Sequence, residues 1–287
     1  MRSSGLVRRS LEADGGRAVS DTVGVWLDLV HALYPPSDAA AWDRPGLQVG
    51  DPAAPATRVL VTLDVTGDVL EEAAQVPGTL VLAHHPLLLA PLVTLTPDTA
   101  AGALALRAAR AGVAVAAAHT NLDAADDGAG TSDPVVAVLG LVDVGPLCAP
   151  ATPGARPMGR VGDLPTPLTL RDLAETIRRG LPSPSARRCG DGSRTVRRVA
   201  VLGGSGMSAV PDALAAGADV LVTGDVRHHA ALDALELGLA VVDAGHHATE
   251  SAAMPALAAR LAEAATARGL TAAVERSTLT TSPWEPA

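Results

Sequence analysis

Short apolar segments alternate along the chain with longer segments of helical periodicity, and this alternation is the feature that most restricts the fold. Apolar runs of about four to eight residues are typical of buried strands, whereas apolar residues spaced by three and four indicate helices. Strands that alternate with helices of about ten residues predict a layered α/β architecture. The expected strands are residues 58–65, 79–83, 113–118, 196–202, 219–222, 239–242 and 271–275. The expected helices are residues 21–34, 67–75, 99–111, 170–181, 208–216, 230–237 and an alanine-rich run that ends near Arg268.

A stretch rich in proline and glycine, from Pro146 to Pro157, predicts a connection between two domains. A chain of 287 residues is also more natural as two modest domains than as one large domain. We expect a first α/β domain from residues 21–133 and 246–276, and a second from residues 134–245. Residues 1–20 are polar and Arg-rich without an apolar central stretch, so we expect a disordered tail there and a loose tail at residues 277–287.

Charge, hydropathy and cysteine content exclude several classes of function. The apolar runs are shorter than the roughly 18 residues that a membrane helix needs, so no membrane is expected as a partner. The net charge is −9 and there is no basic stripe, so nucleic acid is not expected either. Cys148 and Cys189 stand outside any paired motif. This disfavours a disulfide framework or a thiolate zinc site and favours a cytoplasmic location.

Seven of the eight histidines lie at, or directly after, the ends of expected strands. Loops at the carboxyl ends of strands converge on a shared crevice in α/β folds, so this placement indicates a common site. The eighth, His31, lies within the first expected helix and is interpreted as structural. The seven fall in four places, which are His84-His85, His119, His228-His229 and His246-His247.

Carboxylates accompany two of these places at a spacing of four residues. Asp123 follows His119 at this distance, and Glu250 follows His246 at the start of the alanine-rich run. Residues four apart share one face of a helix, so His246 and Glu250 are placed to grip one ion. Imidazoles and carboxylates without thiolates suit Zn, Mn, Fe or Ni and are untypical of structural zinc sites.

The adjacent pair His84 and His85 favours two divalent metal ions over one. Neighbouring side chains cannot point the same way in a regular strand, but at a strand end before Pro86 they can splay toward two ions. A carboxylate can bridge such ions when they are about 3.5–4 Å apart. The best candidate ligands are His84, His85, Asp123, His246 and Glu250, and His119 is either a ligand or the partner of one.

The remaining histidines and one glycine-rich turn have several interpretations. His228 and His229 are candidate catalytic residues that line the substrate cavity. Alternatively, they contact the metal ligands and orient them, or they are polar loop residues. His247 is expected to point away from the ions. The turn at residues 203–206 either offers backbone N–H groups to a phosphate or serves only as a connection.

Five motifs occur in a fixed order: Trp42-Asp43 with Gly46-Leu-Gln-Val-Gly50, Ala83-His-His-Pro86, His119-Thr-Asn-Leu-Asp123, Thr223-Gly-Asp225 with His228-His229, and Gly245-His246 with Glu250. As a set they resemble the GTP cyclohydrolase I type 2 homologue family, also called NIF-three-like dinuclear metal proteins. The resemblance runs from about Val23 to about Glu275, and only Arg44-Pro45 departs from the family's usual residues in the first motif.

The resemblance implies a fold and a set of ligands. It implies two linked α/β domains with a dinuclear metal site in the crevice between them, and a homohexameric ring. It places one ion on His84 and Asp123 and the other on His85 and His246, with Glu250 serving both.

The family name implies that metal-activated water opens the imidazole ring of GTP, which is one kind of hydrolysis of a small-molecule substrate. Metal ions lower the pKa of bound water, and His228 or His229 would shuttle protons. Two other hypotheses need the same ligands. One is hydrolysis of another small substrate such as a phosphoester, and the other is a metal-binding or regulatory scaffold without catalysis.

Overall fold

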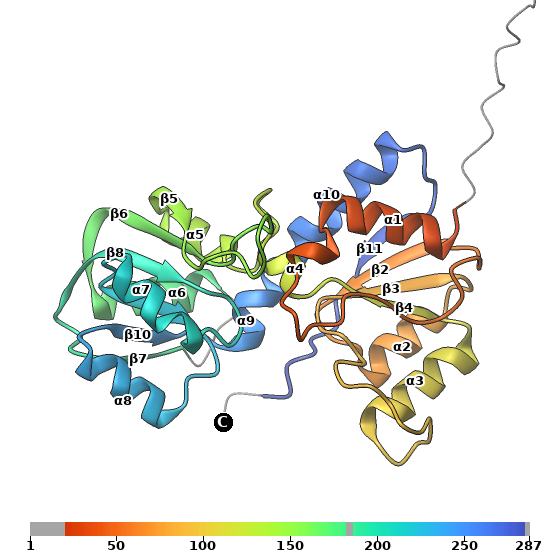
Figure 1. Cartoon of the computed structure of the whole chain (residues 1–287), viewed down its shortest axis with the longest axis horizontal. Coiled ribbons are helices and arrows are strands. Elements are labelled where there is room, and N and C mark those ends of the chain that lie inside the picture. The colour runs from red at the N-terminus through yellow and green to blue at the C-terminus, as the bar shows by residue number, and fades with distance from the viewer. Residues whose placement is uncertain (1–20, 182–185, 285–287) are drawn as a thin grey trace, which may run out of the picture.

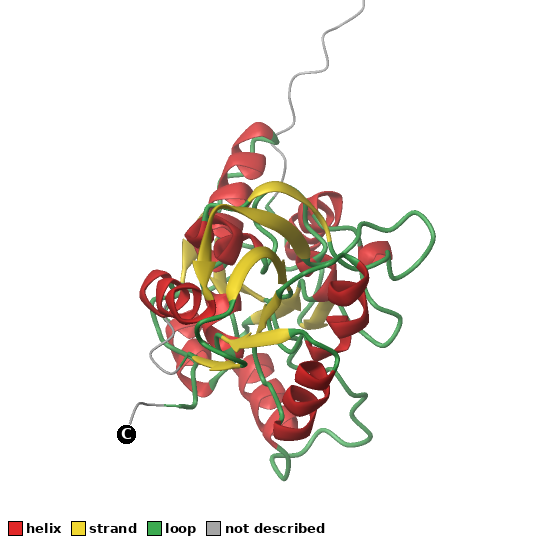
Figure 2. Cartoon of the chain, turned by 90° about the vertical axis from the view of Figure 1, so that its left-hand side faces the viewer, coloured by secondary structure: helices red, strands yellow, loops and turns green. Residues whose placement is uncertain are grey.

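The computed structural model describes residues 21–181 and 186–284, which form two lobes side by side (Figure 1). Each lobe is built on one sheet. Seen along the line that joins the lobes, strands lie in the middle with helices around them (Figure 2). The expected architecture of two linked α/β domains is therefore confirmed. The tail expected at residues 1–20 lies outside the described residues, and the expected domain boundaries stay a prediction.

The first lobe contains a five-stranded sheet. Its strands are β1 (Gly46–Val49), β2 (Arg58–Thr62), β3 (Thr79–Ala83), β4 (Ala114–Ala117) and β11 (Ala273–Arg276), in the spatial order β1-β4-β3-β2-β11. All neighbours are parallel except the edge strand β1, which is antiparallel to β4. Every residue of β2, β3 and β4 is buried. Parallel strands covered on both faces read as unbroken apolar runs, which is why these three were recognisable in the sequence.

Helices cover both faces of the first sheet. They are α1 (Val23–Leu33), α2 (Gly67–Ala74), α3 (Ala100–Ala111) and α10 (Met254–Ala267), with the short turn η1 (Pro36–Asp38) after α1. Val59 and Val61 of β2 pack in one core with Trp26 of α1 and Leu257 of α10. Leu60, between them, packs in a second core with α2 and α3 on the opposite face. The alternation follows from the two-residue period of a strand.

The second lobe contains a six-stranded sheet. Its strands are β5 (Val142–Pro146), β6 (Arg160–Thr169), β7 (Arg187–Cys189), β8 (Thr195–Val201), β9 (Val220–Thr223) and β10 (Ala240–Asp243), in the spatial order β5-β6-β8-β9-β10-β7. Only β8, β9 and β10 are mutually parallel. The core on one face contains side chains of α5 (Asp133–Leu139) and α6 (Leu170–Gly180). The other face carries η2 (Met207–Ala209) and α7 (Val210–Ala215), and α8 (His228–Glu236) packs beside β10.

The carboxyl ends of the parallel strands in the two sheets meet at the junction between the lobes. His85 follows β3 of the first sheet and His246 follows β10 of the second, yet their Nε2 atoms are 3.2 Å apart. The short helix α9 (His246–Ser251) lies at this junction and leads into α10 of the first lobe (Figure 1). The junction is therefore where the strand-end histidines collect.

The alanine-rich run that was expected as one long helix is divided into α9 and α10. The break lies at Ala252 and Ala253, and Pro255 is one of the first residues of α10. Proline has no N–H to donate and disfavours helical backbone at the residue before it, so it starts a new helix more readily than it continues one. The division lets α9 follow the junction while α10 packs on the first sheet.

After β11 the chain continues along the first lobe toward the junction. Ser277 is buried, and its N–H donates to the carbonyl of Val61 at 2.9 Å. Its hydroxyl donates to Glu72 at 2.6 Å. Four residues later the hydroxyl of Thr281 donates to the carboxylate of Asp64. The segment expected as a loose tail is thus attached to the first lobe at Ser277 and Thr281.

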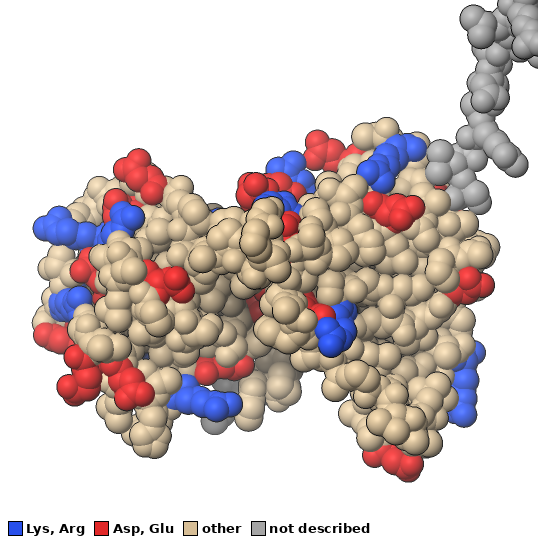
Figure 3. Space-filling model, viewed as in Figure 1, with Lys and Arg blue, Asp and Glu red and all other residues tan. Residues whose placement is uncertain are grey.

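Helix length and surface charge relate to two expectations from the sequence, which are that neither a membrane nor a nucleic acid is a partner. No helix within residues 21–181 and 186–284 is long and apolar enough to cross a membrane. On the face shown in Figure 3, arginine side chains are scattered among aspartates and glutamates. That face therefore offers no continuous basic surface to a nucleic acid backbone.

Candidate metal centre

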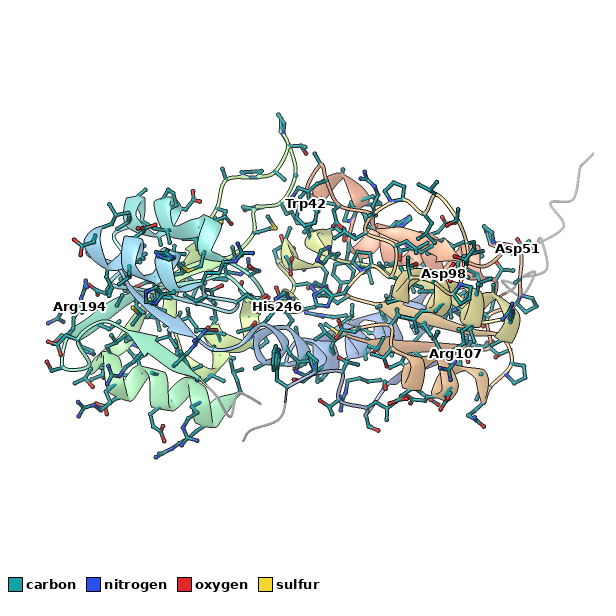
Figure 4. The ribbon with its side chains drawn as sticks, turned by 90° about the horizontal axis from the view of Figure 1, so that it is seen from below. Trp42, Asp51, Asp98, Arg107, Arg194 and His246 are labelled. Atoms are coloured by element: carbon teal, nitrogen blue, oxygen red, sulfur yellow. The ribbon has the colours of Figure 1, made fainter. Side chains whose placement is uncertain are left out.

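Six side chains at the junction form three overlapping groups of metal-ligand type. The ligand atoms lie within 4.8 Å of one another in each group. Two groups share Glu250: the first cluster contains His84, Asp123 and Glu250, and the second contains His85, His246 and Glu250. The third group contains His84, His85 and His119. Figure 4 shows His246 where the two lobes meet. The structure thus brings together all five residues that the sequence singled out as the best candidate ligands.

The end of β3 directs His84 and His85 to different clusters. Their backbone N–H groups donate to the carbonyls of Thr62 and Leu63 at 3.1 and 2.9 Å, and the chain bends at these two residues. The two rings are 4.9 Å apart between centroids and tilted by 51°. This splayed arrangement is the one that the sequence predicted for neighbouring ions.

Glu250 presents its two carboxylate oxygens to the two clusters separately. Oε1 lies 3.6 Å from His84 Nε2, and Oε2 lies 3.0 Å from the Nε2 atoms of both His85 and His246. On the first side, Asp123 Oδ1 is also 3.6 Å from His84 Nε2. Two oxygens of one carboxylate that face two separate sets of nitrogen ligands have the geometry of a bridging ligand.

The hydrogen bonding of the imidazoles leaves lone pairs that face one another. The Nδ1 atom of each ring lies beside an acceptor, which is the carbonyl of Ala118 for His84 and a carboxylate for His85 and His246. Nδ1 is then the protonated nitrogen and Nε2 is an unprotonated donor to a metal. With the Nε2 atoms unprotonated, buried His84 Nε2 and Glu250 Oε2 have no hydrogen-bond donor among the described residues. Buried acceptors without donors are unfavourable, and cations between them would satisfy both clusters.

Carboxylates and imidazoles at the centre shift one another's pKa values, and the carboxylates favour positive charge there. Although burial lowers the pKa of His85, hydrogen bonds with Asp64 and Glu250 raise it to about 10. A hydrogen bond with Glu250, together with the nearby carboxylate of Asp225, raises the pKa of His246 to about 9 against the effect of burial. Burial raises the pKa of Glu250, but the surrounding imidazoles hold it well below its usual value. Protons take the place of metal ions when the centre is metal-free.

His119 lies beside the two clusters, and its ring is held by a separate carboxylate, that of Asp43. Its Nδ1 lies 2.8 Å from Asp43 Oδ1, and Asp43 Oδ2 accepts from both the N–H and the hydroxyl of Thr120. Burial raises the pKa of Asp43, but these hydrogen bonds lower it far below its usual value. The His119 ring is 5.1 and 5.5 Å from the rings of His84 and His85, edge to face. His119 also forms a ligand group with His84 and His85, so its position fits either a ligand or a neighbour of the ligands, and its role stays a prediction.

Comparisons with known proteins agree with this geometry. Residues 22–283 match the sequence model of Duf34/NIF3 (NGG1p interacting factor 3). The chain belongs to the Duf34/NIF3 family. It is 38% identical over 260 residues to a Streptomyces coelicolor protein named GTP cyclohydrolase 1 type 2 homolog, covering 89% of this chain and 90% of that protein. A Nostoc protein of the same name is 37% identical over 206 residues, covering 71% and 77%. The suspected resemblance is thereby confirmed.

Solved structures of the Duf34/NIF3 family share the fold. A Bacillus cereus protein related to NIF3 superposes with a TM-score of 0.85 at 27% identity, covering 93% of this chain and 99% of that one. A Staphylococcus aureus hypothetical protein gives the same TM-score and identity, covering 93% and 100%. The two-lobed arrangement of this Duf34/NIF3 chain is therefore the arrangement of solved relatives.

His228 and His229 lie apart from the two ligand clusters. They begin α8, both are exposed, and their rings are 5.2 Å apart. Neither belongs to a ligand group found among the described residues of this Duf34/NIF3 chain. Their predicted catalytic role stays a proposal.

Sequence reasoning missed the part played by Asp64. It follows β2, beside the strand that supplies His84 and His85, and its Oδ1 lies 2.7 Å from His85 Nδ1. A carboxylate within the otherwise apolar run expected as a strand at residues 58–65 was the signal that could have revealed it. Asp225 was noticed only as a neighbour of His228, but its Oδ2 lies 2.7 Å from His246 Nδ1.

The glycine-rich turn at residues 203–206 closes against the centre. The N–H groups of Gly203, Gly204 and Gly206 donate to hydroxyl groups of the protein, so they are not free for a phosphate. Gly204 has a φ of +66°, and a Cβ there would overlap Glu250 Oε1. The turn is a connection in which position 204 must lack a side chain, because the backbone of this Duf34/NIF3 protein passes next to Glu250 there.

Proposed function

We propose that this protein holds two divalent metal ions at the junction of its lobes and is a hydrolase of a small-molecule substrate. One ion is assigned to His84 and Asp123, the other to His85 and His246, with Glu250 serving both. The observation that carries the proposal is that the two oxygens of Glu250 face two separate imidazole sets. Imidazole and carboxylate ligands without thiolates suit Zn, Mn, Fe or Ni.

The charge of the centre supports two ions rather than one. Asp123 and Glu250 belong to the clusters, and Asp64 and Asp225 lie against the imidazoles of the second cluster. These four carboxylates carry four negative charges when ionised, which equals the charge of two divalent cations. A single divalent ion would balance only two of these charges, although Asp123, Glu250 and Asp64 are all buried or partly buried.

Divalent ions at such a centre supply Lewis acidity and lower the pKa of water toward neutrality. The chain's own contribution to hydrolysis is proton transfer and positioning. His119, oriented by Asp43, is placed at the edge of both clusters to hold or deliver a proton. Trp42, whose side chain is 58% exposed, lies edge-on to His119 with ring centroids 5.8 Å apart and offers an apolar surface to a substrate.

GTP is the first substrate to test because curated relatives carry the name GTP cyclohydrolase 1 type 2 homolog. The turn at residues 203–206 does not favour it, because three of its N–H groups are already occupied. Hydrolysis of another small substrate, such as a phosphoester, is supported equally by the ligands. Product analysis after incubation with GTP, and with a generic phosphodiester, distinguishes the two activities. Metal binding without turnover of either substrate would favour a scaffold.

Metal content tests the centre itself. Glu250→Ala should lower the number of ions per chain from two to one or none while the fold is kept. Elemental analysis of purified protein gives the count, and circular dichroism checks the fold. The matched control is Glu263→Ala, because Glu263 is an exposed glutamate on α10. Two ions per chain in Glu250→Ala would contradict the bridging role.

A cytoplasmic location and a homohexameric ring stay predictions. The location was expected from the cysteine content and the ring from the resemblance. Light scattering coupled to size-exclusion chromatography measures the assembly, and a mass of six chains is expected. A monomer at physiological concentration would contradict the predicted ring.

A further inference from the structure

We propose that Asp64 and Asp225 are positioning residues that aim His85 and His246 at one ion, and that the C-terminal segment supports Asp64 through Thr281. The C-terminal segment is here residues 277–284. This inference rests on the proposed two-ion centre. It concerns how one of the two ion positions is built, not whether ions bind.

The two imidazoles of the second cluster are held in the same way. His85 Nδ1 lies 2.7 Å from Asp64 Oδ1, and His246 Nδ1 lies 2.7 Å from Asp225 Oδ2. Each carboxylate fixes the proton on Nδ1 and fixes the rotation of the ring. The two Nε2 atoms consequently converge, each 3.0 Å from Glu250 Oε2. A carboxylate behind an imidazole also makes the ring a stronger donor to a metal.

The first cluster is built differently. The ring of His84 is supported by a neutral group, the carbonyl of Ala118, at 3.0 Å. Its negative charge comes instead from Asp123, which is placed as a direct ligand beside Glu250. Apart from the shared Glu250, the negative charge of the first position lies on a direct ligand, Asp123. The negative charge of the second position lies on carboxylates that hydrogen-bond to the imidazole ligands. Loss of an outer carboxylate should affect the second position selectively.

Asp225 adopts a backbone conformation that has to be explained. Its φ is +53°, a left-handed value that few residues other than glycine adopt. Its side chain is 59% exposed, so packing does not require an aspartate there. It follows β9 next to Gly224, where a Cβ would overlap the backbone of His246. This left-handed turn, which aspartate tolerates better than most residues, brings the Asp225 carboxylate against the His246 ring.

Asp64 is held from the opposite side by the C-terminal segment. While Oδ1 contacts His85, Oδ2 accepts the hydroxyl hydrogen of Thr281. Ser277, buried and bonded to β2 and Glu72, fixes the chain four residues earlier. One end of the chain is therefore connected through two hydrogen bonds to a metal ligand, His85.

Replacement of the two carboxylates tests the main claim. In Asp64→Ala and Asp225→Ala, the affinity for one of the two ions should fall by about 10- to 100-fold, the range for outer partners of metal ligands. The affinities are measured by competition of Zn²⁺ or Mn²⁺ with a chromogenic chelator. Asp64→Asn and Asp225→Asn keep an acceptor without the charge and should give intermediate losses. Such rescue would not be expected from a purely structural role.

The matched control for Asp225 is Asp143→Ala. Asp143 is the other non-glycine residue with positive φ (+51°) in the described part of the chain, and it is exposed on β5. Its replacement should leave both affinities unchanged. Thermal unfolding of the metal-free variants checks that the fold is intact, and each should still unfold in a single cooperative transition.

Thr281→Val tests the C-terminal segment. Valine has the shape of threonine but cannot donate to Asp64, so the same ion should bind up to about tenfold more weakly, at the lower end of the range for outer partners. Thr280→Val is the control, because Thr280 is the exposed neighbour in the same segment. An unchanged affinity in Thr281→Val would overturn the role of the segment.

The outcomes separate this inference from the proposed function. A wild-type protein that binds no ions would refute the two-ion centre itself. Two ions bound with wild-type affinities in both alanine variants would leave the centre intact and overturn the positioning role. Equal weakening of both ions would overturn the assignment of Asp64 and Asp225 to the second position.

Discussion

The half of the centre around His84 and the half around His85 and His246 share Glu250 but have different surroundings. His84 is fully buried and bonded to the backbone, and Asp123 beside it is 15% exposed. The side chains of His85 and His246 are 24% and 30% exposed. They also come from different lobes. The first half is part of a rigid core, whereas the second half is assembled across the junction and reaches solvent.

This difference teaches that two ions held by similar ligands need not behave alike. The first position depends on packing within one lobe plus Glu250. The second depends on hydrogen bonds to carboxylates and on the contact between lobes. The following predictions test this contrast, beginning with the largest expected effect.

Acid should weaken binding of the second ion steeply. In the metal-free protein the pKa values of His85 and His246 are about 10 and about 9, so both rings are protonated at pH 7. Binding of an ion to both must then displace about two protons, and the apparent affinity should rise about 100-fold per pH unit below pH 9. Chelator competition between pH 6 and 9 measures the slope. A slope below one proton would contradict the assigned ligands.

The same shifts have a consequence for the metal-free protein. Because both pKa values are raised above the unfolded value of 6.5, the protonated rings contribute stability below that pH. This contribution is lost as the pH rises through 9 and 10. The melting temperature of the metal-free protein should therefore fall between pH 7 and 10 more than that of the metal-loaded protein. Parallel thermal scans of the two forms show this difference.

The two halves should also differ in their share of fold stability. His84→Ala removes a fully buried ring and should cost the metal-free protein about 2 kcal/mol of unfolding free energy. His246→Ala removes a ring that is 30% exposed and should cost less than about 1 kcal/mol. Urea unfolding after chelation gives both values. Equal losses would mean that the first half is no more firmly embedded than the second.

The smallest effect on ion binding is expected at His119, which lies beside His84 and His85 but outside the two assigned ligand sets. If His119 carries protons rather than binding an ion, His119→Ala should keep two ions per chain and weaken them by less than about tenfold. Turnover, once a substrate is known, should fall by about 100-fold or more because proton transfer is lost. Loss of one ion would instead make His119 a ligand.

The centre of each sheet could be predicted from the sequence, but the edges could not. β2, β3 and β4 are buried on both faces and therefore appear as apolar runs. The antiparallel strands β1, β5, β6 and β7 were missed. β6 contains Pro165 and Pro167, and its pairing with β8 shifts between Asp163 and Leu168. Proline has no N–H to donate to a neighbouring strand, so a segment that contains proline is not expected to be a strand from its sequence.

The candidate ligands could be predicted because each one follows a buried strand or shares a helix face with a residue that does. The outer contacts could not be predicted. Asp64 meets Thr281, which is 217 residues away along the chain, and Asp225 meets His246 across a turn of unusual backbone. No local pattern encodes such pairs, since they depend on how the lobes and the C-terminal segment come together.

The return of the chain from the second lobe to the first determines when the centre can form in a cell. Translation delivers β2, β3 and β4 early, and then every described strand of the second lobe. Only afterwards do α9, α10 and β11 emerge, and with them His246 and Glu250. A nascent chain can display His84, His85 and Asp123 while it still lacks the carboxylate between them. At the proposed centre, loading with metal would therefore be a late event, coupled to completion of the first sheet rather than to its beginning.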